Sequence, residues 1–194
     1  MPWILEPSYA TNQPEWRYIN EVPPPIGFRN ADFIPSAEDM RRPLLIELLP
    51  QSRDPNDFAA APGANANVIV SQRFKECVAA FEPSLHNFMP VVVSRPGGEL
   101  CPDPFYLLKL GELLDDSIDL EQSTLAVNQR MNRYYPTKIP PNIMWKASKV
   151  RGRHLWADRK LLSILAVSDE LFALFKANNI RGFVSKESRI DGIL

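Results

Sequence analysis

Prolines are concentrated at one end of the chain: eleven of its 19 prolines fall within residues 1–62. Proline fixes the backbone angle φ and lacks an N–H donor, so it excludes long helices and central β-strands. The same residues carry more large apolar side chains than a disordered linker holds. We therefore predict that residues 1–62 form an irregular Pro-rich arm packed on an α+β core of residues 63–194, within a single domain. These apolar side chains are Trp3, Trp16, Tyr18, Phe28, Phe33 and Phe58.

Two short elements are expected inside this arm. Ser36 stands before acidic residues, a pattern that caps and favours the first turn of a helix, so a short helix is predicted over 36–41. An apolar run lies between Pro43 and Pro50, which predicts a strand over 44–49.

The clearest pattern in the rest of the chain occurs twice, at 68–93 and at 165–185. Each stretch runs from apolar residues into Val-Ser, then into a helical apolar periodicity, then into a strand-like run. Ser71 and Ser168 are both placed to cap a helix. The chain is therefore predicted to form two similar strand–helix–strand units whose helices pack on one mixed sheet, an α+β fold. A nucleophilic serine needs a base, and neither copy has one nearby in sequence.

Further strands are predicted from their alternating or apolar patterns and from the turns that bound them. The runs 87–94 and 104–110 are expected to pair across the turn at 95–99. The runs 143–148 and 154–157 are expected to form a second pair across 149–153, and 161–167 and 181–186 complete the set. The acidic stretch 115–123 is expected to be a loop or a short helix.

The overall charge is balanced, with 22 Lys and Arg against 23 Asp and Glu. This balance argues against a general polyanion binder, although it allows a local patch. The start of the chain has no basic segment followed by an apolar segment, and no run approaches the about 18 apolar residues of a membrane span. Two cysteines make no disulfide framework. We predict a cytoplasmic protein that binds no membrane.

Residues that could carry chemistry are few. His86, His154, Cys77 and Cys101 have no metal-ligand spacing, and the periodicity around Cys77 directs that thiol into the core. Cys101 with His86 or His154 could form a nucleophile–base pair, although a turn cysteine and two unrelated histidines are the favoured interpretation. There is no Gly-rich phosphate loop and no Gly-x-Ser-x-Gly turn. The sequence therefore predicts no catalytic residue, no metal site and no cofactor.

Four carboxylates gather at Asp115, Asp116, Asp119 and Glu121. A pair of them in a cleft would suit acid–base catalysis, a solvated loop is the simplest alternative, and a negative patch would steer a basic protein partner. A calcium loop is excluded because the regular spacing and the glycine are missing.

A basic turn is the second charged feature. Lys146, Lys149, Arg151 and Arg153 lie between two tryptophans, a mixture that can bind single-stranded nucleic acid. Strand alternation offers the other interpretation, with both tryptophans in the core and the charges in the connecting turn. The neutral overall charge favours this second interpretation.

Several short motifs, taken in order, resemble the imm-eleven immunity-protein family of bacterial polymorphic toxin systems, over residues 27–184. The resemblance implies a cytoplasmic protein that is encoded beside a toxin and neutralises it by direct binding. A small enzyme and a nucleic-acid module using residues 146–153 remain the alternatives. The motifs are Val70-Ser-Gln-Arg-Phe74, Phe88-Met-Pro-Val91, Tyr106-Leu-Leu-Lys-Leu110, Ile118-Asp119 with Ser123, Gly152-Arg-His-Leu-Trp156, Val167-Ser-Asp-Glu-Leu171 and Ile180-Arg-Gly-Phe183.

The matched residues of this family are caps and core positions, so the resemblance implies no catalytic residue and no defined contact surface. For the partner surface we predict Asp115, Asp116, Asp119 and Glu121, which would suit a basic toxin such as a nuclease. The sequence leaves the oligomeric state open.

Overall fold

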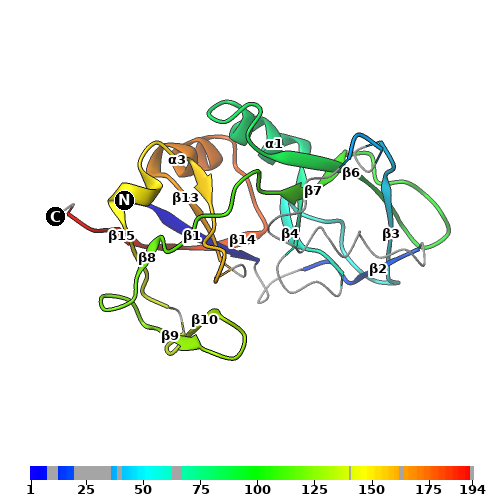
Figure 1. Ribbon diagram of the computed structural model, residues 1–194. Helices are drawn as coiled ribbons and strands as arrows, with labels where there is room; N and C mark the ends of the chain where they lie inside the picture. Colours follow the sequence, from blue (N-terminus) through cyan, green and yellow to red (C-terminus); the bar gives the residue numbers. More distant parts are fainter. Residues whose placement is uncertain are drawn as a thin grey trace.

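Two helices lie side by side above the strands, and each is connected to a different sheet (Figure 1). The computed structural model describes residues 1–7, 13–19, 36–38, 41–62, 67–139, 141–161 and 164–192. Within these ranges the fold is α+β and consists mostly of strands. The helices are α1 (Gln72–Ala79), α2 (Ala147–Val150) and α3 (Asp169–Ala177).

The strands form sheets of six, four, three and two strands. Their orders are β2-β3-β6-β7-β5-β4, β12-β13-β1-β14, β15-β11-β8 and β10-β9. The bounds are β1 (Trp3–Pro7), β2 (Trp16–Tyr18), β3 (Leu44–Leu48), β4 (Phe58–Ala60), β5 (Val68–Ser71), β6 (Asn87–Ser94), β7 (Phe105–Lys109), β8 (Ile118–Asp119), β9 (Leu125–Asn128), β10 (Arg133–Pro136), β11 (Met144–Trp145), β12 (Leu155–Trp156), β13 (Leu165–Val167), β14 (Phe183–Glu187) and β15 (Arg189–Ile190).

The two stretches with a shared sequence pattern have the same local arrangement in two separate sheets. Strands β5 and β6 flank α1 in sequence, and both run antiparallel to β7, which lies between them. Strands β13 and β14 flank α3 in sequence, and both run antiparallel to β1, which lies between them. The prediction of one sheet is therefore wrong. Each pair of strands encloses a third strand of its own and so belongs to a separate sheet. The two stretches therefore contact each other through their helices.

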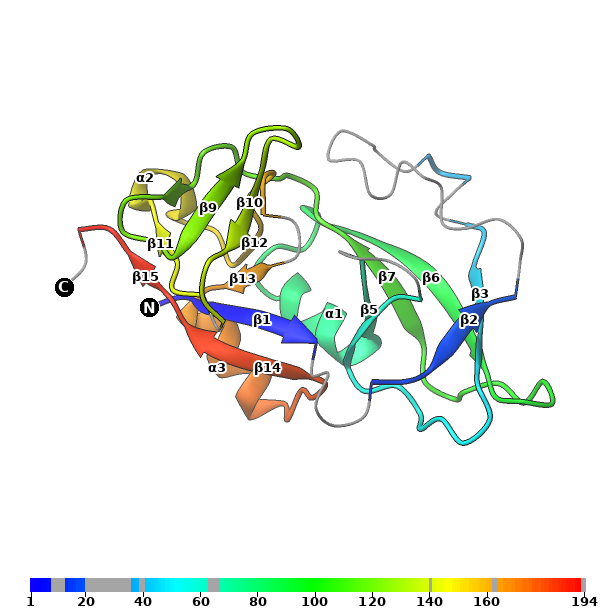
Figure 2. The ribbon, with the colours of Figure 1, turned by 90° about the horizontal axis from the view of Figure 1, so that it is seen from below.

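Strand β1 corrects the prediction that residues 1–62 hold no central strand. It lies between β13 and β14, and Figure 2 shows it beside β14. Its alternating side chains Ile4 and Leu5 are buried on opposite faces. The prolines at positions 2 and 7 stand at the limits of the strand, where they remove no interior hydrogen bond. Strand β3 is also interior, and it confirms the strand predicted over 44–49. The helix predicted over 36–41 lies partly outside the described residues.

The second predicted pair, 143–148 with 154–157, is wrong. Strand β11 pairs with β8 and β15, whereas β12 pairs with β13. Helix α2 occupies part of the connection and carries the chain from one sheet to the other. The expectation that both tryptophans are core residues is met: Trp145 and Trp156 are buried, with ring centroids 5.7 Å apart.

Serine caps begin both long helices, as the sequence predicts. The Ser71 hydroxyl accepts a hydrogen bond from the Phe74 amide, and the Ser168 hydroxyl accepts one from the Leu171 amide, each at 3.2 Å. Helix α1 buries Phe74, Cys77 and Val78, whereas α3 buries Leu171, Phe172 and Phe175.

The two helices contact each other through the Phe74 and Phe175 rings, whose centroids are 4.6 Å apart. Helix α1 begins where α3 ends: Arg73 donates to the carbonyl oxygens of Asn178 and Asn179. Asp57 joins the same two ends, because it accepts from the Ser71 hydroxyl at 2.7 Å and from the Arg181 amide at 3.0 Å. The helix pair is therefore held by side-chain packing and by a buried carboxylate.

Replacement of the two caps should have unequal effects on stability. Ser71→Ala and Ser168→Ala should each lower the free energy of unfolding by about 1 kcal/mol, the usual value of a cap. Ser71→Ala should cost more, because its hydroxyl also donates to the buried carboxylate of Asp57, whereas the second partner of Ser168 is the half-buried His154 ring. Urea unfolding followed by circular dichroism measures both values. Ser148→Ala, at an exposed position of α2, is the control, and cap variants as stable as this control would contradict the assignment.

Candidate functional site

The acidic loop that the sequence singles out is largely compensated by cations. The Asp115 carboxylate lies 2.8 Å from the Arg159 Nε, and the Asp116 carboxylate lies 2.7 Å from the Lys160 Nζ. The hydrogen bond from Lys160 lowers the pKa of Asp116, with the lysine charge adding to the effect. Both pairs are exposed, so each adds little to stability, but together they cancel two of the four negative charges.

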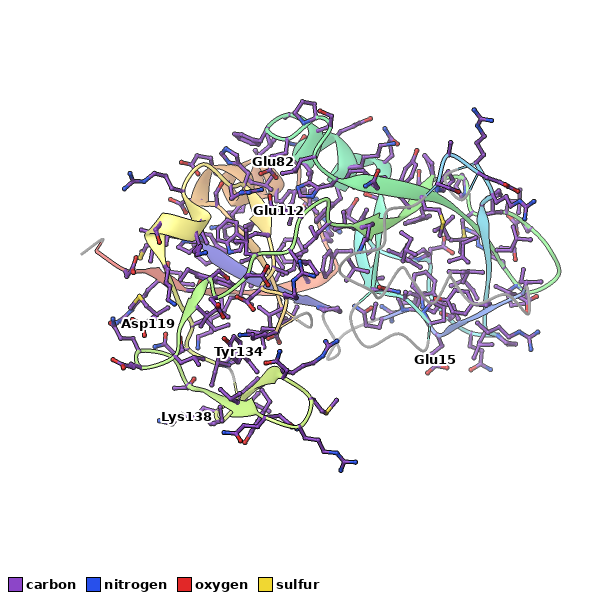
Figure 3. All side chains as sticks on the ribbon, in the orientation of Figure 1. Glu15, Glu82, Glu112, Asp119, Tyr134 and Lys138 are labelled. Carbon is purple, nitrogen blue, oxygen red and sulfur yellow. The ribbon has the colours of Figure 1, made fainter. Side chains whose placement is uncertain are left out.

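The other two carboxylates have different roles. The Asp119 side chain accepts hydrogen bonds from the Glu121 amide at 3.0 Å and from the Gln122 amide at 3.3 Å, which fixes a local turn. Figure 3 labels Asp119 near β8. Glu121 is exposed, and of the four it alone makes no side-chain contact within the described ranges. The structure places these residues in one loop, and their role toward a partner stays a prediction.

Asp158 organises this loop and was missed by the sequence analysis. It is fully buried, and its Oδ2 accepts from the Ser117 amide at 2.9 Å and from the Ser117 hydroxyl at 2.7 Å. Its Oδ1 accepts from the Lys160 amide at 2.8 Å. Both oxygens are occupied, so this carboxylate has a structural role. No local sequence signal identifies it, because Ser117 is far away along the chain.

Both histidines of the chain lie beside one buried carboxylate, Glu82, which Figure 3 labels next to the helices. The His86 Nε2 is 2.8 Å from Glu82 Oε2, while the amides of His154 and Leu155 donate to the two Glu82 oxygens at 2.9 and 3.1 Å. Burial acts to raise the pKa of Glu82, but the hydrogen bonds from His86 and His154 outweigh it and lower the pKa. Glu82 thus ties the end of α1 to the strand β12.

The structure does place a base beside one of the capping serines. The His154 Nδ1 lies 2.9 Å from the Ser168 Oγ. The two residues are 14 positions apart in the sequence, so local sequence patterns did not identify His154 as a base for this serine. The Ser168 oxygen already accepts from the Leu171 amide, and Glu82 bonds the His154 backbone instead of its ring. The His154 ring also stacks on Phe81 at 4.3 Å. This arrangement anchors the start of α3 rather than activating a nucleophile.

The cysteines are separated from the histidines. Cys77 is buried in the core beside the helices, as predicted, and Cys101 is half-buried near Asp54. Burial raises the pKa of both thiols, which lowers their reactivity. Among the described residues no three His, Cys, Asp or Glu side chains gather as metal ligands. None of the helices in that part of the chain is long and apolar enough to cross a membrane.

The basic turn lacks the aromatic surface that nucleic-acid stacking needs. Both Trp145 and Trp156 are buried in the second core cluster, together with Val150 of α2. Arg153 is paired with Glu112, while Lys149 and Arg151 are exposed. Charge remains at this turn, but no tryptophan ring is available to a base.

A hairpin formed by β9 and β10 was not identified by the sequence analysis. It lies below the body of the molecule in Figure 1, on the side opposite the helices, and it forms a separate two-stranded sheet. Four large apolar side chains are exposed on it and just after it: Val127, Met131, Tyr135 and Ile139.

The sequence does contain a signal for this hairpin. Residues 122–157 hold seven cations and no Asp or Glu, although the whole chain is balanced. The near-zero net charge of the whole chain does not reveal this local excess of cations. The seven are Arg130, Arg133, Lys138, Lys146, Lys149, Arg151 and Arg153.

Comparison with known proteins gives one finding. The sequence profile of a family described as "Immunity protein family (Imm11)" matches residues 4–188. A search of curated proteins finds no match. The family match confirms the resemblance that the ordered motifs indicate, and it extends that resemblance to include β1.

Glu82→Gln should destabilise the fold and change its response to acid. In the variant, the N–H groups of the glutamine would face at least one of the three groups of His86, His154 and Leu155 that now bond to Glu82. This should lower the free energy of unfolding by about 1–3 kcal/mol at pH 7. Because the folded state lowers the Glu82 pKa, its contribution is complete above the ordinary value of 4.5 and is lost as the pH falls through the folded-state pKa. The free energy of unfolding of the variant should therefore depend less on pH below 4.5.

Urea unfolding at a series of pH values between neutrality and acid gives this comparison. Glu121→Gln, at an exposed position, is the matched control and should follow the wild type. A Glu82→Gln protein with the stability and acid response of the wild type would contradict the role of Glu82.

Proposed function

Since the chain belongs to the Imm11 immunity protein family, we propose that it binds a cognate bacterial toxin and neutralises it by direct protein–protein contact. The observation that carries this proposal is the extent of the match, which runs from β1 to the residue before β15. The matched region therefore includes both helices, all strands that enclose them, and the hairpin.

The internal structure supports a binding role without a reaction. Glu82, Asp158 and the Ser168 hydroxyl have the features of catalytic groups, yet each is occupied by backbone amides. An inhibitor needs a surface whose conformation is fixed before binding, since ordering it afterwards weakens affinity. The helix pair, tied at one end by Asp57 and at the other by Glu82, provides a rigid support for such a surface.

The proposal includes the setting of the encounter. The toxin belongs to a polymorphic toxin system used in competition between bacteria, and the two proteins meet in the cytoplasm. The acidic loop is one candidate for steering a basic toxin such as a nuclease. Its pairing with Arg159 and Lys160 leaves Asp119 and Glu121 as the carboxylates without a cation partner among the described residues.

A survival assay tests the proposal directly. The toxin encoded next to this chain should kill a sensitive host when expressed alone, and co-expression of this chain should restore viable counts. The two proteins should also co-purify, because neutralisation is by contact. A soluble, folded chain that neither rescues growth nor binds the neighbouring protein would contradict the proposal.

The same assay separates binding from enzymatic protection. Cys101→Ser removes a candidate nucleophile and His154→Gln removes a candidate base, including the one beside Ser168, and both variants should rescue growth as the wild type does. Thermal unfolding of each purified variant checks that it is folded. Loss of rescue in a folded variant that still binds the toxin would favour an enzyme.

A further inference from the structure

We propose that the β9–β10 hairpin is the surface that binds the toxin, and that it binds an acidic, partly apolar face of that protein. This inference rests on the proposed function. The acidic loop would favour a basic toxin, whereas this proposal predicts an acidic contact face on the toxin, because it assigns the contact to cations of this chain.

The base of the hairpin is fixed to the body of the protein. Leu125 is buried in the second core cluster, and Tyr134 packs against the same cluster. The Tyr134 amide donates to the Lys160 carbonyl oxygen at 2.8 Å, and the Lys160 ammonium lies 5.5 Å from the Tyr134 ring. Strand register pairs Tyr135 with Ala126, on the face opposite Leu125 and Tyr134. One face is thus anchored, and the other carries Tyr135 outward.

The tip of the hairpin has a defined conformation. The Asn128 side chain accepts a hydrogen bond from the Met131 amide at 3.1 Å, and Asn132 adopts a left-handed φ of 49°, which asparagine tolerates. This turn holds Arg130 and Met131 at the end of the hairpin. A preformed tip loses little conformational entropy when it binds.

The exposed side chains are of the types found in protein interfaces. Met131 is 64% exposed, Tyr135 49% and Ile139 93%, with Val127 at 43%. Tyr, Met and Arg are enriched at the centres of protein–protein contacts. Single exposed apolar residues are ordinary, but four within 13 positions on and just after one hairpin indicate a contact surface. The register places Val127 on the same face as Leu125 and Tyr134, so Met131, Tyr135 and Ile139 are the main contact residues.

The charges of the hairpin lack internal partners. Arg130, Arg133 and Lys138 are exposed, and none forms an ion pair with the residues that the structure describes. Figure 3 labels Lys138 on the hairpin, away from the helices. Several exposed cations elsewhere face carboxylates, as with Arg17 and Glu47 or Arg95 and Asp54, whereas Lys149 and Arg151 of the basic turn form no ion pair with the described residues. The partner must supply the anions, so its contact face is acidic.

An apolar cavity lies between β1, β14 and Pro141, which follows the hairpin in sequence. It has a volume of about 330 Å³ and is lined by Ile4, Pro141 and Val184 among others. The Lys186 ammonium donates to the Pro141 carbonyl oxygen at 2.8 Å, which holds this segment against β14. The cavity can accept an apolar side chain of the partner next to the contacts made by Ile139.

These features favour a protein over a nucleic acid or a membrane. Tyr135 is the one exposed aromatic ring of the described hairpin, since Tyr134 is partly covered by Lys160, and Val127, Met131 and Ile139 cannot stack on bases. The chain as a whole has a net charge of -1, so it lacks the general attraction for a polyanion.

The test is a titration of purified wild-type and variant chains against the purified toxin encoded next to this chain. Arg130→Glu with Arg133→Glu should weaken binding by about 10-fold or more. Met131→Ala with Tyr135→Ala should weaken it by about 30-fold, the usual effect of removing a central aromatic contact. The matched control is Lys149→Glu with Arg151→Glu, which makes the same change in net charge outside the hairpin and should bind as the wild type.

The outcomes separate the two proposals. A wild-type chain that neither binds the toxin nor restores growth overturns the proposed function. If the wild-type chain binds the toxin, two results would overturn the assignment to the hairpin. One is that the folded hairpin variants bind as tightly as the wild type, and the other is that the control variant loses as much affinity as they do. Slower toxin association in Glu121→Lys would instead favour the acidic loop and a basic toxin. If the hairpin variants lose affinity for phosphatidylserine vesicles or single-stranded RNA but not for the toxin, the proposal that the hairpin binds a protein would be overturned.

Discussion

The contact between α1 and α3 is the interaction on which the rest of the fold depends. Each helix is connected to a different sheet, and the tilted Phe74 and Phe175 rings join the two helices within one core cluster. Buried carboxylates then fix the ends of this pair: Asp57 links the start of α1 to the residues after α3, and Glu82 links the end of α1 to β12. Because a buried carboxylate is costly unless all its bonds are made, these links permit one relative position of the helices.

The repeated sequence pattern is explained by this architecture and carries no shared chemistry. Ser71 and Ser168 cap equivalent helices with the same geometry, but their outer partners differ: Asp57 accepts from Ser71, whereas the His154 ring contacts Ser168. A catalytic role for the repeat would require similar partners at both sites. What the two copies share is the hydrogen bond to the third amide of the helix, which is a requirement of any helix start.

Features set by neighbours in sequence could be predicted, and features set by distant residues could not. The caps and the strand at 87–94 follow from local patterns, and three of the motifs that indicate the family, at 70–74, 88–91 and 167–171, lie on these same elements. The central position of β1 depends on β13 and β14, at the other end of the chain, so the proline content of residues 1–62 gave the wrong answer. The density of carboxylates at 115–121 was visible, but their pairing with Arg159 and Lys160 bridges 44 residues and was not.

Stability and partner choice are carried by different parts of this chain. The hairpin contributes Leu125 to the core and packs Tyr134 against it, while Met131 and Tyr135 are exposed. Substitutions at exposed positions away from packing and caps change stability little, so the outward residues Met131 and Tyr135 can vary without loss of the fold. An immunity protein needs this separation, because each new toxin demands a new surface on an unchanged scaffold. The net charge near zero conceals the proposed binding surface, because it sums the acids and bases of the whole chain and does not show that the hairpin cations lie in a stretch without acids.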